Sequence, residues 1–250
     1  LASLLPVGAI SWLYYADRIV QLPLGIVGIA LGTALLPRFS QAEAEANNAV
    51  VKTALGGAII FAGFLVIPAA TGLIILAEPI LKGLFAHGAF TDRDAGMAGF
   101  ALIAYAIGLP GFVLVKILQP AFYAAGRPGT VLKISAIMVA SNIAGSLLLM
   151  GPFGHVGLAI ATALSGLLAA AIMVMLLAAA DKFSRAILLP LGRILLAASV
   201  MAALLWFLGP IVSDMASVVR LLILVVAGSV TYFATAALFG AIPSDLLHRC

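Results

Sequence analysis

Apolar residues follow one another along this chain in seven long stretches, which are separated by short polar segments or by proline and glycine. The stretches are residues 10–37, 50–77, 96–123, 131–150, 155–180, 188–209 and 217–240. A helix needs about 20 apolar residues to cross a bilayer. Barrel strands alternate in polarity over about 10 residues, whereas these stretches are longer and evenly apolar. The pattern therefore predicts an all-α integral membrane protein, a polytopic bundle of about seven transmembrane helices.

The composition supports a membrane protein. Hydrophobic residues make up 64% of the chain and charged residues 9%, and the mean hydropathy is +1.26. A soluble domain has about 25% charged residues. The net charge of +4 would suggest nucleic-acid binding in a soluble protein, but membrane proteins collect Lys and Arg in their cytoplasmic loops. We therefore expect no nucleic-acid partner.

The basic residues predict the orientation. If the seven stretches cross the membrane, one side carries Arg38, Lys52, Arg127, Lys133, Lys182, Arg185, Arg193 and Arg249, and the other carries Lys82, Arg93 and Arg220. The richer side is expected to be cytoplasmic. The first residues then lie outside and the C-terminus inside. The sequence begins without an initiator Met or a basic leader, and we expect it to be a fragment that lacks an N-terminal part.

The first stretch contains two adjacent charges, Asp17 and Arg18. On a helix they point about 100° apart, so they do not face each other. Gln21 lies one turn further along, and Pro23 removes a backbone hydrogen bond just beyond it. Because charges at membrane depth are costly, we interpret this segment as the lining of a polar cavity. The structural alternative pairs Asp17 with a basic residue on another helix and Arg18 with backbone carbonyls.

A second charge within a stretch is Lys116, which lies between Pro110 and Pro120. It either lines the same cavity or extends its ammonium group to the membrane interface. Gly28 and Gly32 follow the first charged pair at helical spacing. Small residues at this spacing usually let helices pack closely in lipid, which is the role we expect for them.

No enzymatic, metal or cofactor site is evident in the sequence. The single cysteine is Cys250, and three histidines are scattered without metal-ligand spacing. Asp92 and Asp94 are better explained as caps at the start of the third stretch. Asn142 and Ser146 are expected to form hydrogen bonds between helices.

Specific segments resemble the lipid II flippase family known as MurJ or MviN, within the superfamily of multidrug, oligosaccharidyl-lipid and polysaccharide exporters. The block SWLYYADR at residues 11–18 is the most specific of them. The other matching segments are LP at 22–23, Gly28, ALGT at 30–33, LP at 36–37, LF at 84–85, Gly88, Phe90 and Thr91, LIAY at 102–105, and Lys116 through PAFY at 120–123.

The resemblance implies half of a two-lobed transporter in the bacterial inner membrane. Residues 1–180 would form part of the C-terminal lobe, about five helices, and residues 181–250 a helix pair that makes a groove for a lipid tail. The N-terminal lobe would be a missing partner. The implied function is translocation of lipid II, the undecaprenyl-diphosphate-linked peptidoglycan precursor used in cell-wall synthesis, by alternating access among the membrane lipids.

In that scheme Arg18 would contact the diphosphate, since guanidinium groups match phosphate oxygens in pairs. Asp17 would orient cations in the cavity, Ser11 would line it, and Lys116 would add positive potential. Many relatives carry an acidic residue where this chain has Gln21, so a carboxylate role does not transfer to it. Two alternatives stay open, a drug or cation antiporter of the same superfamily and a membrane scaffold that transports nothing.

Overall fold

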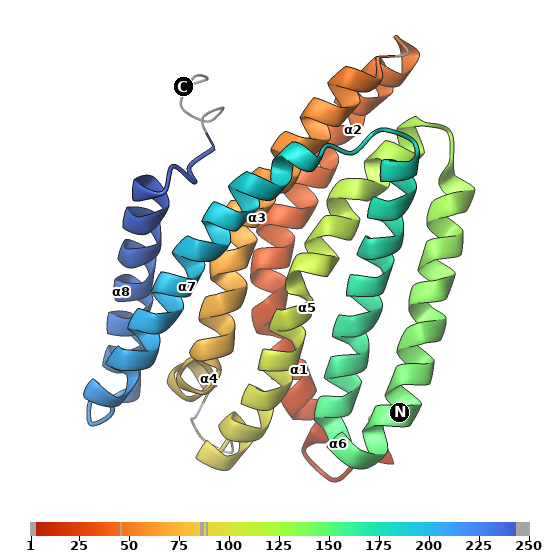
Figure 1. The fold of residues 1–250 in the computed structure, drawn as a ribbon. Coiled ribbons are helices and arrows are strands. Elements are labelled where there is room, and N and C mark those ends of the chain that lie inside the picture. The colour runs from red at the N-terminus through yellow and green to blue at the C-terminus, as the bar shows by residue number, and fades with distance from the viewer. Residues whose placement is uncertain (1–3, 46, 86–87, 89, 244–250) are drawn as a thin grey trace.

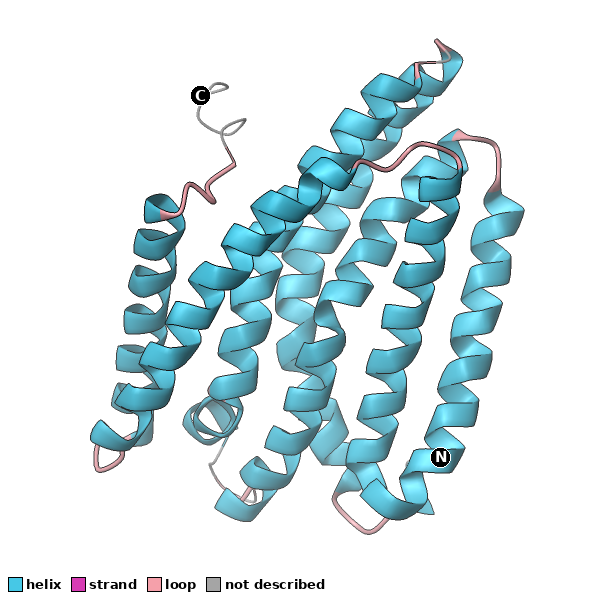
Figure 2. Cartoon of the chain, in the orientation of Figure 1, coloured by secondary structure: helices cyan, strands magenta, loops and turns pink. Residues whose placement is uncertain are grey.

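The computed structural model describes residues 4–243 except 46, 86–87 and 89. This part of the chain is helical and contains no strand (Figures 1 and 2). The elements are α1 (Ala9–Pro23), the π-helix η2 (Leu24–Ile29), α2 (Ala30–Ala44), α3 (Asn48–Ile75), α4 (Ala77–Phe85), α5 (Asp92–Ala124), α6 (Pro128–Ala179), the 3-10 helix η3 (Arg185–Ile187), α7 (Leu188–Ile211) and α8 (Ser217–Leu238).

The helical path crosses the bundle seven times. Six continuous helices of the described chain are long and apolar enough to span a membrane, and one of them is α6 with 52 residues. This helix folds back on itself at Gly154, where φ is 56° and ψ is −131°, so it supplies two antiparallel arms (Figure 1). The all-α membrane bundle predicted from the sequence is confirmed. The interruption expected between residues 150 and 155 is smaller than predicted, because one glycine with positive φ makes the turn.

The connections fall alternately at two ends of the bundle (Figure 1). We call one of them the basic end, since the described cationic residues there are Arg38, Lys52, Arg127, Lys133, Lys182, Arg185 and Arg193. It holds the end of α2, the turn from α5 to α6 and the connector 180–184. The opposite end holds the fold-back of α6, the helix α4 and the turn from α7 to α8. Arg249 lies outside the described residues.

Helix α5 forms the centre of the main apolar core. It packs against α1, α2, α3, α4 and α6. Its contact with α6 depends on small residues, because a Cβ on Gly108 would lie 2.6 Å from the Cα of Ala163, and one on Gly111 would lie 2.9 Å from the backbone of Leu167. Such close backbone approach is the usual way for helices to associate in lipid.

A second apolar cluster attaches α7 and α8 to α3. Ile194, Leu205, Leu224 and Tyr232 are buried in it together with Phe64 of α3. The opposite faces of α7 and α8 expose large apolar side chains, among them Trp206, Phe207, Ile211, Leu222 and Val226. The helix pair therefore presents several large apolar side chains on that side, as expected for a face in contact with hydrocarbon.

One polar contact crosses that cluster. The hydroxyl of Tyr232 donates to the carbonyl of Phe64 at 2.6 Å. In a regular helix this carbonyl would accept from the N–H of residue 68, but residue 68 is proline and has none. The tyrosine of α8 thus satisfies a carbonyl that the proline of α3 leaves without its helical donor.

The short helix α4 lies across the direction of the bundle and is seen end-on in Figure 1. Ala77, Leu81 and Gly83 are buried, while Lys82 pairs with Glu78 at 2.8 Å on the other face. The hydrogen bond that Lys82 donates to the Glu78 carboxylate raises the pKa of Lys82. Because the folded-state pKa is the higher one, this stabilisation persists below the ordinary lysine value of 10.5 and is lost as the pH rises through the raised value.

Candidate functional site

The charged residues of α1 are joined through a neutral amide. Gln21 donates from Nε2 to the carboxylate of Asp17, and its Oε1 accepts from Nη1 of Arg18 at 3.4 Å. The guanidinium carbon of Arg18 also lies 4.7 Å from the centre of the Tyr14 ring. Within the described part of the chain no carboxylate pairs with Arg18, so its positive charge is not neutralised.

These residues share one face of α1. Ser11, Tyr14, Arg18 and Gln21 are exposed, and their spacing of three and four residues places them one above another. The opposite face packs into the core through residues that are all buried, namely Ala9, Trp12, Ala16, Ile19 and Val20. We call the exposed stripe the Arg18 face. It carries polar groups along an otherwise apolar membrane-spanning segment.

The Arg18 face ends at an irregular part of the helix. Because Pro23 has no N–H, the carbonyl of Ile19 loses its helical donor, and the N–H of Leu24 bonds to the carbonyls of both Gln21 and Val20. The π-helix η2 begins at Leu24. Widened turns of this kind are frequent at functional sites.

Lys116 belongs to α5 and lies beside η2 and α2, which continue the helical path of α1. A Cβ on Gly28 would lie 3.5 Å from the Lys116 side chain, and one on Gly32 would lie 2.9 Å from the Lys116 carbonyl oxygen. Pro120 leaves that carbonyl without its helical N–H donor. The Lys116 side chain is exposed, and no described carboxylate pairs with it.

The structure therefore gathers Asp17, Arg18 and Gln21 into one cluster but does not bring Lys116 to it. Gly28 follows Arg18 by ten residues, which corresponds to about 15 Å along a helix axis. Pro110 lies within α5 on the other side of Lys116. Arg18 and Lys116 therefore lie at different levels of the bundle, and Lys116 is the nearer of the two to the basic end.

A second polar cluster, at the opposite end, was not expected from the sequence. The indole N–H of Trp12 donates to Asp94 at 2.8 Å, and the ring of Trp12 lies 4.9 Å from that of His155. Nε2 of His155 lies 2.9 Å from the carbonyl oxygen of Met97. A cavity of about 410 Å³ adjoins these side chains. The cluster ties the starts of α1 and α5 to the turn of α6.

The predicted caps and interhelical bonds are found only in part. Thr91 caps α5 and forms a capping box with Asp94, so the predicted cap is confirmed for Asp94. Asn142 donates to Thr162 at 3.0 Å between the two arms of α6, which confirms the prediction for Asn142. Ser146 is buried, and its hydroxyl has no hydrogen bond to the described residues.

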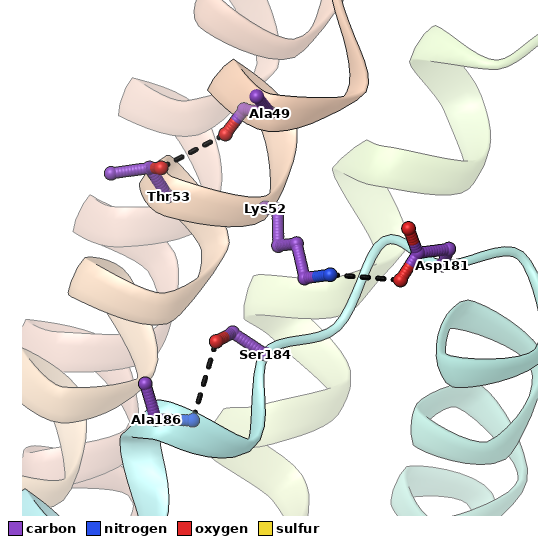
Figure 3. Close-up of polar contacts among 6 residues, drawn as sticks. All are labelled: Ala49, Lys52, Thr53, Asp181, Ser184 and Ala186. Atoms are coloured by element: carbon purple, nitrogen blue, oxygen red, sulfur yellow. Dashed lines mark hydrogen bonds and ion pairs between the residues drawn. The ribbon is translucent and has the colours of Figure 1, made fainter.

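Two ion pairs hold the connector 180–184 at the basic end. Asp181 accepts from Lys52 of α3 at 2.8 Å (Figure 3), and Lys182 pairs with Glu43 of α2. The connector ends at Ser184, whose hydroxyl accepts from the N–H of Ala186 at 3.2 Å. Two consecutive residues of the connector therefore bind two different helices.

Among the described residues no group of three or more His, Cys, Asp or Glu side chains could hold a metal ion. His87, His248 and Cys250 lie outside the described residues.

Comparison with known proteins gives consistent matches. The family model described as "Lipid II flippase MurJ" matches residues 1–227. A "Probable lipid II flippase MurJ" of Haemophilus influenzae is 38% identical over 265 residues, which covers 100% of this chain and 51% of that protein. The protein of the same description from Vibrio cholerae is 40% identical over 172 residues, 69% of this chain and 33% of its own.

A solved structure described as "Lipid II flippase MurJ, inward closed conformation" has the same fold. The TM-score is 0.79 at 25% sequence identity, and the match covers 96% of this chain and 48% of that chain. This chain therefore spans about half the length of the Haemophilus protein and of the solved structure. Because the family model covers most of the sequence, the chain belongs to the lipid II flippase MurJ family.

Proposed function

We propose that the polypeptide carrying this sequence moves lipid II across the bacterial cytoplasmic membrane by alternating access, and that Arg18 binds the diphosphate of this lipid. The observation that carries the proposal is the exposed guanidinium of Arg18, which lies within an apolar span and which no described carboxylate neutralises. Keeping such a charge at membrane depth is costly. A transported anion gives that charge a function.

The chemistry of the Arg18 face fits a diphosphate. A guanidinium group can donate two parallel hydrogen bonds to phosphate oxygens. In this chain Gln21 and Tyr14 hold Arg18 without removing its charge, so the remaining N–H groups are free to bind an anion. Lys116 lies along the same path and adds a second exposed cation, and Ser11 supplies a hydroxyl on the Arg18 face.

We place the basic end in the cytoplasm, because cytoplasmic loops collect Lys and Arg. The first residues then lie outside and the C-terminus inside. Residues 1–180 would form part of the C-terminal lobe, and 181–250 a helix pair whose apolar faces bind the lipid tail. A further lobe would cover the Arg18 face and complete the cavity, which is supported by the half-length match to the family.

The test replaces Arg18 in the polypeptide at its full natural length, in cells depleted of their own flippase. Arg18→Ala is expected to reduce lipid II in the outer leaflet about tenfold or more, as for loss of a charge-assisted hydrogen bond. Arg18→Lys should restore little, since an ammonium group lacks the guanidinium fork. Arg185→Ala, which removes an exposed arginine of η3 at the basic end, is the matched control and should flip normally. Normal flipping by both Arg18 variants at normal membrane levels would contradict the proposal.

The alternatives from the sequence are less well supported. A cation antiporter would need an available carboxylate in the cavity, and that of Asp17 accepts a hydrogen bond from Gln21. A scaffold without a substrate would be expected to neutralise its internal charges, but neither Arg18 nor Lys116 pairs with a described carboxylate.

A further inference from the structure

We propose that a cavity at the basic end binds the phosphate headgroup of an anionic membrane phospholipid. The cavity has a volume of about 240 Å³. It lies where the end of α2, the end of α5 and the second arm of α6 meet, beside the connector 180–184. It is separate from the Arg18 face, and the proposal does not depend on which lipid the transporter moves.

The charges of the cavity suit a single negative charge. Its charged lining residues are Glu43, Arg127 and Lys182. Glu43 pairs with Lys182, and no described side chain pairs with the guanidinium group of Arg127, which is exposed. The net charge of the lining is therefore +1, and Arg127 carries it. A phosphodiester with one negative charge complements such a site.

The apolar walls and their surroundings suit a lipid rather than a soluble anion. Phe122 and Leu177 line the cavity and are buried. Next to them Tyr123 and Leu176 are exposed at the surface of the bundle, where acyl chains would lie. A headgroup in the cavity could therefore keep its tails in the hydrocarbon.

The size of the cavity limits the headgroup. Its volume of about 240 Å³ corresponds to about eight water molecules and is below the roughly 300 Å³ at which small-molecule pockets begin. A glycerol phosphate group is of this size, whereas a disaccharide with an attached peptide is much larger. This favours an ordinary phospholipid over the lipid-linked precursor.

The location also favours a membrane lipid. Basic pockets between membrane helices on the cytoplasmic side commonly bind anionic headgroups. Arg127 directly precedes α6 and Lys182 follows it closely, so both lie at the level where the helices leave the membrane. Under the orientation proposed above, the ligand would come from the cytoplasmic leaflet.

The experiment uses the full-length polypeptide, purified in detergent and titrated with dioctanoyl-phosphatidylglycerol or dioctanoyl-phosphatidylcholine while Tm is measured. Phosphatidylglycerol should raise Tm at lower concentration than phosphatidylcholine. Arg127→Gln should weaken the apparent affinity for phosphatidylglycerol about fivefold, as expected for one arginine near an anionic surface, and Arg127→Lys should keep most of it. Lys133→Gln is the control, because Lys133 is exposed at the same end but does not line the cavity.

Several outcomes would overturn the proposal. Equal weakening by Arg127→Gln and Lys133→Gln would mean that the lipid responds only to the overall charge of this end. If Arg127→Gln left the affinity for phosphatidylglycerol unchanged, the cavity would not be the binding site of this lipid. Displacement of the lipid by millimolar glycerol 3-phosphate would indicate a soluble anion. If Arg127→Gln abolished lipid II flipping but kept phosphatidylglycerol binding, the cavity would belong to the transport path.

Discussion

At the scale of single residues, Arg18 is held by two neighbours that leave its charge intact. Gln21 accepts one of its N–H groups at 3.4 Å, and Tyr14 presents its ring at 4.7 Å. A carboxylate in either place would lower the positive potential offered to an anion. The Gln21 amide also donates to Asp17, so it keeps the two adjacent charges in fixed and separate positions.

This arrangement predicts a difference between two substitutions of Tyr14. Tyr14→Leu removes the ring that faces the guanidinium group and should lower lipid II flipping about two- to fivefold, the range expected for an exposed cation–π contact. Tyr14→Phe keeps the ring and should flip normally. Flipping assays in depleted cells, with membrane levels measured, would decide. Equal activity of the two variants would show that the ring does not position Arg18.

At the scale of helices, the prolines decide where one helix must meet another. Pro68 deprives the Phe64 carbonyl of its helical donor, and Tyr232 of α8 supplies the replacement. Pro120 likewise deprives the Lys116 carbonyl of its helical donor, and α2 approaches that carbonyl closely at Gly32. In lipid no water can satisfy such groups. The loss of a local hydrogen bond therefore specifies a tertiary contact.

The pairing of Tyr232 with Pro68 can be tested by a double-mutant cycle. Tyr232→Phe should lower the free energy of unfolding by about 1 kcal/mol, as for other hydrogen bonds between membrane helices. In a Pro68→Ala background the helical N–H returns, so the same substitution should cost clearly less. Tyr123→Phe is a control, since Tyr123 is exposed. Unfolding in denaturing detergent measures each difference, and equal costs in the two backgrounds would contradict this account.

Gly32 and Gly25 offer a second comparison at this scale. A Cβ on Gly32 would lie 2.9 Å from the backbone oxygen of Lys116, whereas a Cβ on Gly25 would have no neighbour within 4 Å. We expect Gly32→Ala to lower Tm, because the backbone of α2 or α5 must shift. Gly25→Ala should leave Tm unchanged or raise it, since alanine favours helix by up to about 1 kcal/mol. A Tm loss of the same size in both variants would show that backbone contact at Gly32 is not the cause.

At the scale of the whole molecule, the connector 180–184 links the helix pair to the rest of the bundle. Its Asp181 and Lys182 bind α3 and α2 respectively. The two ion pairs differ in burial, because the side chains of Lys182 and Glu43 are 14% and 22% exposed, whereas Asp181 is 87% exposed. Water therefore screens the Lys52–Asp181 pair much more than the Lys182–Glu43 pair.

The two pairs should therefore contribute differently to stability. Lys52→Gln is expected to cost less than about 1 kcal/mol. Lys182→Gln leaves Glu43 without a partner in a mostly buried place and should cost roughly 3 kcal/mol. Adding Glu43→Gln to Lys182→Gln should recover most of that loss. Tm and the free energy of unfolding would show which substitution destabilises the protein more. A larger loss from Lys52→Gln than from Lys182→Gln would contradict this prediction.

The sequence by itself determined the fold class, the number of membrane crossings and the charged segment of α1. These follow from local properties, namely the length of apolar runs and the cost of charge in lipid. The cap expected at Asp92 and Asp94 is also a local feature, and the structure shows it at Asp94. The proline at residue 23 likewise indicated where the first helix would lose its regular hydrogen bonds.

Only the tertiary structure decided which distant groups meet. Trp12 and Asp94 are 82 residues apart and Tyr232 and Phe64 are 168 apart, and no local pattern marks either pair. Lys116 is about 15 Å from the Arg18 level along the helix, whereas the sequence left open whether it lines the same cavity or reaches the membrane interface. The physical reason is that helix packing depends on the shapes of facing surfaces. The helix that packs against them decides whether a carbonyl freed by proline finds a new donor and whether a glycine takes part in a close contact.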